Sequence, residues 1–141
     1  MYKKLRSFAK IPLAAFLAAA VLLPAASAAQ PNPAEMAAAA QFIASRTDGD
    51  PYAVRRAMAS VLLNRLDDPR FPDTVSGILA REGYAAGRPS PSYLSARSAL
   101  RAASEGLDIT GGATAFARAG TPEAARIRVT LMIEDWVFGL E

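Results

Sequence analysis

Residues 51–66 constrain the fold more than any other stretch, because their apolar side chains recur at the spacing of an α-helix. Helical spacing gathers these side chains into one stripe, which is stable only when other elements cover it. Asp50 and Pro51 suit the N-cap and the first helical position, and the run ends at Asp67-Asp68-Pro69. We therefore expect the central core helix here. Its stripe consists of Val54, Met58, Val61, Leu62 and Leu66. The side chains expected to pack against it are Ile43, Val75, Ile78, Leu100 and Phe116.

Three further helices are predicted around this one from start and stop signals. Asn32-Pro33-Ala34-Glu35 has the sequence of a capping box, and the helix that it opens runs to about Arg46. Asp73 is the expected cap of a short helix that continues to Leu79. Ser90 and Pro91 are expected to open the fourth helix. The predicted apolar positions of that helix are Leu94, Leu100, Ala103 and Leu107.

The last third of the chain switches to the period of a β-strand. Thr110-Gly111-Gly112 is a predicted turn, and residues 113–117 are a predicted short strand. A second strand is predicted from the alternating residues Ile127, Val129, Leu131 and Ile133. A turn at Glu134-Asp135 would then lead the chain back through residues 136–138. The predicted fold class is α+β, mostly helical, with a short C-terminal β-hairpin.

Residues 1–29 have the features of a signal peptide. Lys3, Lys4, Arg6 and Lys10 precede an apolar stretch over residues 13–23, and small residues follow at the expected cleavage site. The apolar stretch is short for a bilayer-spanning helix, although an uncleaved anchor is the alternative. We therefore expect an exported domain over residues 30–141, secreted or periplasmic, with no stable membrane anchor once the leader is removed.

The basic charge of the whole chain belongs largely to this leader. Of the 16 lysines and arginines, four lie in the leader, so 12 arginines remain against 13 acids, a net charge of −1. The arginines are scattered among acids, which is typical of a solvated surface. A nucleic-acid partner is not expected, because it would require a clustered basic face.

The absence of cysteine and histidine excludes several catalytic classes. Without them the chain cannot form a Ser-His-Asp or Cys-His system, a histidine-ligated zinc site or a disulfide. We predict no cofactor and no metal. The hydrolytic chemistry that remains is carboxylate chemistry of the kind that glycosidases use.

Three motifs share one order and spacing with a known family. They are Val61-Leu62-Leu63-Asn64-Arg65, Phe71-Pro72-Asp73-Thr74-Val75-Ser76-Gly77 and Thr110-Gly111-Gly112-Ala113-Thr114-Ala115-Phe116. With Ile43-Ala44-Ser45-Arg46-Thr47-Asp48-Gly49-Asp50-Pro51 ahead of them, the chain resembles the spore-cortex-lytic, SleB-type cell wall hydrolases. The resemblance covers roughly residues 39–139. It implies a small lysozyme-like domain and the glycan strands of peptidoglycan as the ligand.

Arg46 stands where that family pattern, I-x-x-E-A-x-G-E-P, has its catalytic glutamate. A guanidinium stays charged and only donates, so it cannot act as a general acid or base. The family's pair of glutamates becomes Arg46 and Asp50, for which we expect an ion pair. The alternative is that Arg46 holds an anionic part of a ligand, such as a muramyl carboxylate. The remaining candidates for a displaced catalytic acid are Asp48, Asp50 and Glu82.

Other polar positions of the family also differ here. Gly83-Tyr84-Ala85 stands in place of Q-F-S, Arg118-Ala119 in place of N-P, and Trp136 in place of a histidine. Tyr84 and Trp136 are expected to be packed rather than functional, and they would stack on sugars if a groove exposed them. The residues expected around a ligand cleft are Arg46, Tyr84, Gly111, Gly112, Phe116 and Trp136.

The leading hypothesis is a catalytically degenerate cell wall hydrolase that at most binds glycan. One alternative is an active glycan-strand hydrolase or lytic transglycosylase that uses a displaced carboxylate. The other is a non-catalytic helical protein that regulates a hydrolase and binds no glycan. A carboxylate deep in a cleft would favour the first alternative, and a filled cleft beside an exposed apolar patch would favour the second. The sequence does not identify a protein partner.

Overall fold

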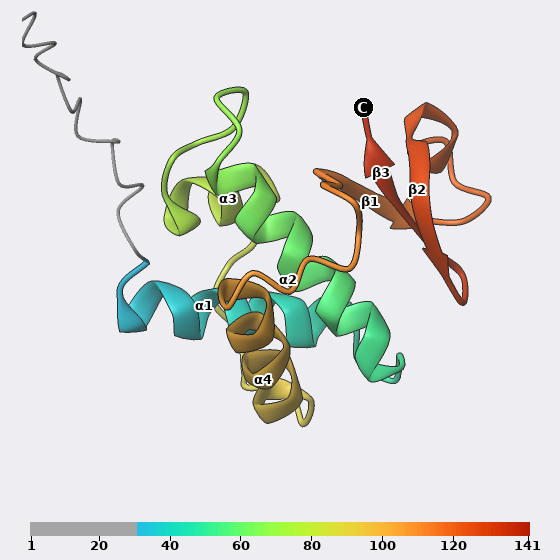
Figure 1. Cartoon of the computed structure of the whole chain (residues 1–141). Coiled ribbons are helices and arrows are strands. Elements are labelled where there is room, and N and C mark those ends of the chain that lie inside the picture. The colour runs from blue at the N-terminus through green and yellow to red at the C-terminus, as the bar shows by residue number, and fades with distance from the viewer. Residues whose placement is uncertain (1–30) are drawn as a thin grey trace, which may run out of the picture.

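A computed structural model describes residues 31–141, so the predicted leader lies outside the described residues. Four helices gather on one side and three strands on the other (Figure 1). The α+β class, with mostly helical content and a C-terminal hairpin, is confirmed. The elements are α1 (Pro33–Arg46), α2 (Tyr52–Leu66), α3 (Val75–Arg81), α4 (Tyr93–Ser104), β1 (Ala115–Arg118), the 3₁₀ turn η1 (Ala124–Arg126), β2 (Arg128–Ile133) and β3 (Trp136–Leu140). None of the helices within residues 31–141 has both the length and the apolar content needed to cross a bilayer.

The helix α2 is the centre of the core, as its apolar stripe predicts. It packs against α1, α3 and α4, and it also touches the sheet. Val54, Met58, Val61 and Leu62 are buried, and Leu66 is half-buried at the end of the helix. Of the predicted partners, Ile43, Val75, Ile78 and Leu100 are buried, and Phe116 is half-buried against the same cluster.

The helix starts were predicted with mixed success. Asn32 and Glu35 form the expected capping box on α1. The cap predicted for α2 was wrong, because that helix begins at Tyr52 without a side-chain cap and the Asp50 carboxylate points elsewhere. The cap of α3 is Thr74 rather than Asp73, because the Thr74 hydroxyl accepts a hydrogen bond from Gly77 N at 3.1 Å.

The predicted apolar face of the fourth helix was partly wrong. The helix α4 begins at Tyr93, and Leu94 is 74% exposed. Leu94 and Leu100 are six residues apart, which places them about 120° apart around a helix, so one face cannot bury both. Leu107 lies beyond the end of the helix and is also exposed. The buried residues of α4 are Ala96, Ala99, Leu100 and Ala103.

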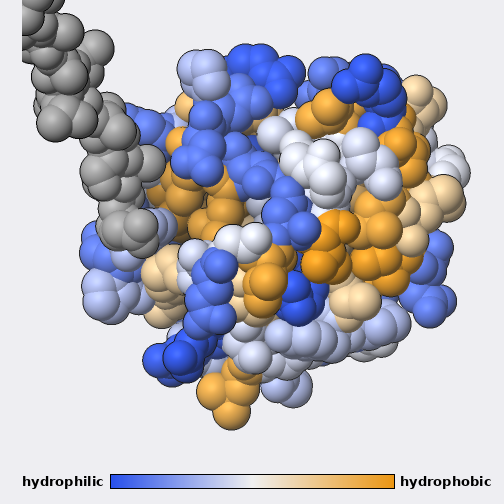
Figure 2. All heavy atoms as spheres, viewed as in Figure 1, coloured by the Kyte–Doolittle hydropathy of each residue, from blue (hydrophilic) through white to orange (hydrophobic). Residues whose placement is uncertain are grey.

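The strands form one antiparallel sheet in the order β1-β3-β2. The predicted hairpin is therefore β2 and β3, and Glu134 at its turn has the left-handed φ of 53°. A register shift between Val129 and Leu131 interrupts the alternation, which explains why Val129 is exposed although its pattern predicted an inward side chain. Met132 is also exposed, and apolar surface lies on the sheet side of the molecule among hydrophilic residues (Figure 2).

Gly139 is required where β3 passes β2. A Cβ added at this residue would lie 2.0 Å from the carbonyl oxygen of Arg128, which is backbone and cannot move aside. Any side chain at position 139 would therefore force the two strands apart.

We predict that Val61→Asp prevents stable folding of residues 30–141. The substitution buries an unpaired charge at the centre of the core and should cost several kcal/mol, a large part of the stability of a small domain. Circular dichroism during thermal unfolding measures this. Ala53→Asp adds the same charge to an exposed position of α2 and should unfold like the wild type. Cooperative, near-wild-type unfolding of Val61→Asp would contradict the central place of α2.

Candidate functional site

A row of aromatic rings connects the helices to the sheet. Phe42 of α1 lies between Tyr84 and Phe116, with ring centroids 5.4 and 6.5 Å away. Trp136 of β3 follows at 6.0 Å from Phe116, and Phe138 lies 6.4 Å farther along. The edge-on and tilted contacts among Phe42, Phe116 and Trp136 hold the start of β3 against the C-terminal half of α1.

An open cleft of about 280 Å³ lies beside this row. It brings together four residues singled out from the sequence, namely Arg46, Glu82, Phe116 and Trp136. The rest of its lining comes from Ala117, Arg118, Thr121 and Glu123. Of the other predicted residues, Tyr84 is half-buried against Phe42, whereas Gly111 and Gly112 lie in a turn that does not line the cleft.

Arg46 is the last residue of α1 and its side chain is exposed at the cleft. Its Nη2 donates a hydrogen bond to the carbonyl oxygen of Glu82 at 3.2 Å, and its guanidinium lies over the Phe42 ring at 5.2 Å. The predicted ion pair with Asp50 was wrong. Gly49 adopts a left-handed φ of 80° in the turn after α1, and the chain then carries Asp50 toward the sheet instead of back toward Arg46.

Asp50 belongs instead to a network with two residues of the sheet. Its carboxylate accepts hydrogen bonds from Arg118 Nη2 at 3.1 Å and from Trp136 Nε1 at 3.0 Å, and its side chain is only 12% exposed. The Arg118 guanidinium lies 4.2 Å from the centre of the Trp136 ring and also binds Asp135, whose pKa it holds below the ordinary value. Asp50, Arg118 and Trp136, which the resemblance singled out at three separate motifs, satisfy one another here. This mutual fit was not visible in the sequence, because the three residues are far apart along the chain.

Glu82 lies between two guanidinium groups. Its carboxylate forms an ion pair with Arg65 of α2, and its backbone carbonyl accepts the hydrogen bond from Arg46. The Arg65 guanidinium also donates to the Thr114 carbonyl at 2.7 Å and lies 5.0 Å from the Phe71 ring and 5.3 Å from the Phe116 ring. Glu82 is therefore fixed in position and is not the freely solvated loop residue that its sequence context suggests.

Asp48, the third candidate acid, lies apart from the cleft. It is exposed, and its carboxylate accepts a hydrogen bond from the Ser92 hydroxyl at 3.1 Å. Ser92 directly precedes α4, so this contact joins the turn after α1 to the start of α4. Within residues 31–141, no three acidic side chains come together as a metal site would require. The cleft itself can offer hydrogen-bond donors, aromatic surface and two carboxylates, of which Glu82 is ion-paired and Glu123 is exposed.

Residues 49–138 match the protein family described as Cell Wall Hydrolase. The chain belongs to the cell wall hydrolase family. A curated relative, the spore cortex-lytic enzyme of Halalkalibacterium halodurans, is 38% identical over 82 residues. That match covers 55% of this chain but only 25% of the relative, so the chain spans about a quarter of its length.

Two solved structures have the same fold. The catalytic domain of the SleB protein of Bacillus cereus superposes with a TM-score of 0.65 at 24% identity, over 79% of this chain and 93% of that one. The catalytic domain of the germination-specific lytic transglycosylase SleB from Bacillus anthracis gives 0.64 at 24% identity, over 77% and 95%. The lysozyme-like, mostly helical architecture predicted from the resemblance is thus confirmed.

The Leu-Asn-Arg motif of this family member joins α2 to the segment that enters β1. Asn64 Nδ2 donates to the Ala113 carbonyl at 2.9 Å, and Arg65 Nε donates to the next carbonyl, that of Thr114. Asn64 also binds the carboxylate of Asp108 at 3.1 Å. The sequence predicted that this motif closes a helix, and the structure adds that it holds one side of the cleft in place.

Asp108 organises the Thr-Gly-Gly turn, a role that the sequence reading missed. Its carboxylate accepts from Thr110 N at 2.7 Å, from the Thr110 hydroxyl at 2.6 Å and from Gly112 N at 2.9 Å. Burial raises the pKa of Asp108, but the hydrogen bonds from Thr110, Asn64 and Gly112 outweigh it, so that pKa lies below its ordinary value. An Asp two residues before a Thr-Gly-Gly turn is the signal that could have revealed the role.

We predict that Asp108→Ala lowers the free energy of unfolding by about 1–3 kcal/mol at pH 7, because it leaves the Thr110 and Gly112 amides without their acceptor. A carboxyl whose pKa is depressed in the folded state contributes stability above its unfolded pKa of about 3.9 and loses it as the pH falls through the folded value. The difference between wild type and variant should therefore shrink below about pH 4.

Urea unfolding between pH 7 and pH 3 measures this difference. Asp73→Ala is the matched control, because Thr74 and not Asp73 caps α3, and it should change stability by less than about 0.5 kcal/mol. An Asp108→Ala penalty that stays constant down to pH 3 would show that the carboxylate charge does not stabilise the turn.

Proposed function

We propose that this chain is an exported, non-catalytic member of the cell wall hydrolase family that binds the glycan strands of peptidoglycan in the cleft beside Arg46. One observation carries the proposal: the Arg46 guanidinium lies at the cleft, and two of the three candidate acids are already held by other arginines. These are Glu82, which pairs with Arg65, and Asp50, which pairs with Arg118.

Cleavage of a glycosidic bond requires a group that gives a proton to the leaving oxygen. Such carboxyl groups act in apolar surroundings that favour their neutral form. Glu82 lies between the guanidinium of Arg65 and the side chain of Arg46 instead, and Asp50 accepts from Arg118 and Trp136. Arginine itself only donates hydrogen bonds. Neither Glu82 nor Asp50 is therefore suited to deliver the proton, and Glu123, the other carboxylate at the cleft, is exposed to solvent rather than held in apolar surroundings.

The assignment of Arg46 to the family's acid position rests on the spacing of the motifs. The residues that match the family begin at Gly49, three positions after Arg46. In support, Arg46 ends α1 at the cleft, beside aromatic residues, and three of the six residues predicted for the ligand cleft lie there. A change from glutamate to arginine at such a place exchanges a proton donor for an anion-binding group.

The same surroundings suit a carbohydrate with carboxylates. Phe116, which is half-buried, supplies an aromatic edge for the apolar face of a sugar ring, whereas Trp136 is buried against Arg118. Arg46 supplies a guanidinium that is in no ion pair within residues 31–141. Peptidoglycan carries carboxylates on its muramyl groups and stem peptides, which a guanidinium can bind with two parallel hydrogen bonds. The aromatic contact and the guanidinium both favour binding of a glycan, and neither can cleave it.

The second candidate function is an active glycan-strand hydrolase in which Glu82 is the acid. Its position favours this alternative, since Glu82 lines the cleft and its side chain is 22% exposed. The ion pair with Arg65 argues against it, because a carboxylate so engaged must first break that contact before it can carry a proton.

Export is part of the proposal and rests on the leader over residues 1–29. Its basic start, apolar middle and small residues at the cleavage site are those of a signal peptide. Peptidoglycan lies outside the cytoplasm, so a secreted or periplasmic location would bring the domain to its ligand.

We predict that residues 30–141 release no soluble glycan fragments from purified sacculi, whereas an active SleB catalytic domain does so in the same assay. Mass spectrometry of the soluble products is the measurement. Arg46→Glu should gain little activity, because Asp50, Arg118 and Trp136 also differ from the family pattern and substrate positioning supplies several kcal/mol of a catalytic barrier. Cleavage by the unmodified domain that disappears in Glu82→Gln or Asp50→Asn would overturn the proposal and identify the acid.

We predict that Arg46→Ala weakens binding to sacculi about tenfold, which is the effect of losing one charge-assisted hydrogen bond. Co-sedimentation over a range of sacculus concentrations measures it, and circular dichroism checks that the variant is folded. Arg88→Ala removes an equal charge from an exposed loop and should bind like the wild type. Equal losses in both variants would indicate general electrostatic attraction instead of a site at the cleft.

A further inference from the structure

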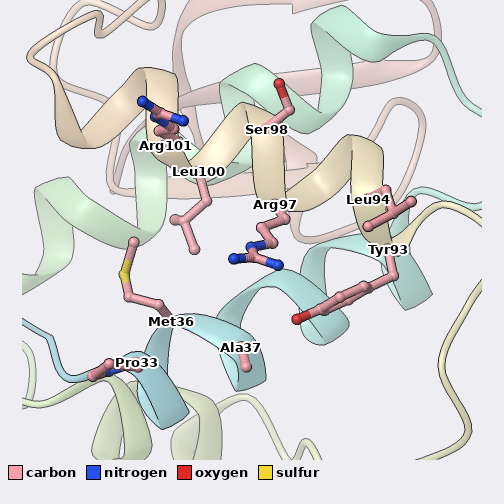
Figure 3. Close-up of a pocket in the computed structure, with 9 residues that line it drawn as sticks. All are labelled: Pro33, Met36, Ala37, Tyr93, Leu94, Arg97, Ser98, Leu100 and Arg101. Atoms are coloured by element: carbon pink, nitrogen blue, oxygen red, sulfur yellow. The ribbon is translucent and has the colours of Figure 1, made fainter.

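A groove of about 540 Å³ lies between the first half of α1 and the outer face of α4. Figure 3 shows Arg97 reaching from α4 across the groove toward α1, with Tyr93 and Leu94 toward one end and Met36 toward the other. Met36 and Arg46 are ten residues apart on α1, or about 15 Å along its axis. The groove is therefore separate from the cleft, and the two can be occupied together.

Apolar and aromatic residues form most of the lining of the groove, beside two arginines and a serine. Met36 and Tyr93 are half-buried against the core, and Leu100 below them is buried. Leu94 is 74% exposed, the highest value among the large apolar residues of the part of the chain that is described. A single exposed leucine is ordinary on a protein surface, but this one borders a groove that Met36, Tyr93 and Leu100 also line.

The charges along the groove have one sign. Arg97 and Arg101 line it together with the apolar residues, and no carboxylate does. Arg97 is in no ion pair within residues 31–141, and Arg101 meets only Glu105, in a pair whose side chains are 82% and 58% exposed. Exposed pairs of this kind are weak, so Arg101 remains available to an incoming anion. An occupant with carboxylates is favoured.

The shape indicates what kind of occupant fits. The apolar and basic residues of α4 recur at the spacing of one helical stripe, since Leu94, Arg97 and Arg101 are three and four residues apart. A groove between two helices, with apolar walls and charges on one rim, accepts an amphipathic helix with its apolar face down. A glycan would instead need broad aromatic surface, and Tyr93 is the one aromatic residue in this lining.

We propose that the groove between α1 and α4 binds an acidic amphipathic helix of a partner protein. The apolar residues of the partner contact Leu94, Met36 and Tyr93, and its carboxylates pair with Arg97 and Arg101. This inference does not depend on the proposed glycan binding, because it uses other residues at the other end of α1.

The test uses a synthetic helix of about 14 residues, roughly four turns, with leucines at helical spacing flanked by glutamates. A second peptide has lysine at every glutamate position. Fluorescence anisotropy with residues 30–141 measures both affinities, and amide chemical shifts show where each peptide binds. We expect the glutamate peptide to bind at least about tenfold more tightly than the lysine peptide, with shifts at Met36, Leu94 and Arg97.

Charge reversal gives the sharper result. In Arg97→Glu with Arg101→Glu the preference should invert, so that the lysine peptide binds more tightly, while Leu94→Asp should weaken both peptides. Arg88→Glu is the matched control and should leave the preference unchanged. Binding that ignores the peptide's charge, shifts confined to the sheet or the cleft, or self-association of the domain through the groove would each overturn the proposal.

Discussion

The guanidinium of Arg65 is the contact on which both the fold and the cleft depend. It is nearly buried, lies between the rings of Phe71 and Phe116, and joins α2 to the backbone before β1 and to Glu82 after α3. Arginine suits this place because its planar group can stack on rings while its edge donates several hydrogen bonds. Three parts of the chain that are distant in sequence therefore have one common partner. Glu82 is the counter-ion of Arg65. The ion pair that stabilises the cleft therefore also engages the Glu82 carboxylate.

The fold was predictable wherever a pattern is local. The stripe of α2 and the capping box at Asn32 depend on residues within a few turns of each other, and both are as expected. The predicted apolar stripe of α4 was partly wrong. Leu94 and Leu107 do not lie on the face of α4 that packs against the other helices, and both are exposed. The prediction of the α2 cap failed for a related reason, because the Asp50 carboxylate binds two residues that are distant in sequence, Arg118 and Trp136, instead of the helix end.

Half of the residues predicted for the ligand cleft line it, and the pairing predicted for Arg46 was wrong. Arg46, Glu82, Phe116 and Trp136 come together, as their assignment to one motif set suggested. The arginines that neutralise the two acids could not be chosen from the sequence, because twelve arginines outside the leader are equal candidates until the chain is folded. Asp50 with Arg118 and Trp136 illustrates the limit: three separate departures from a family pattern become one compensated arrangement only in space.

The central position of β3 in the sheet determines when the sheet can form. β3 follows both of its neighbours in the chain, yet it lies between them, so β1 and β2 have no strand to pair with until β3 has emerged from the ribosome or crossed a membrane. The helices, whose contacts are earlier in the chain, can gather first. One wall of the cleft, including Trp136, then closes in the final step. Until β3 is available, the cleft therefore lacks the wall that Trp136 supplies.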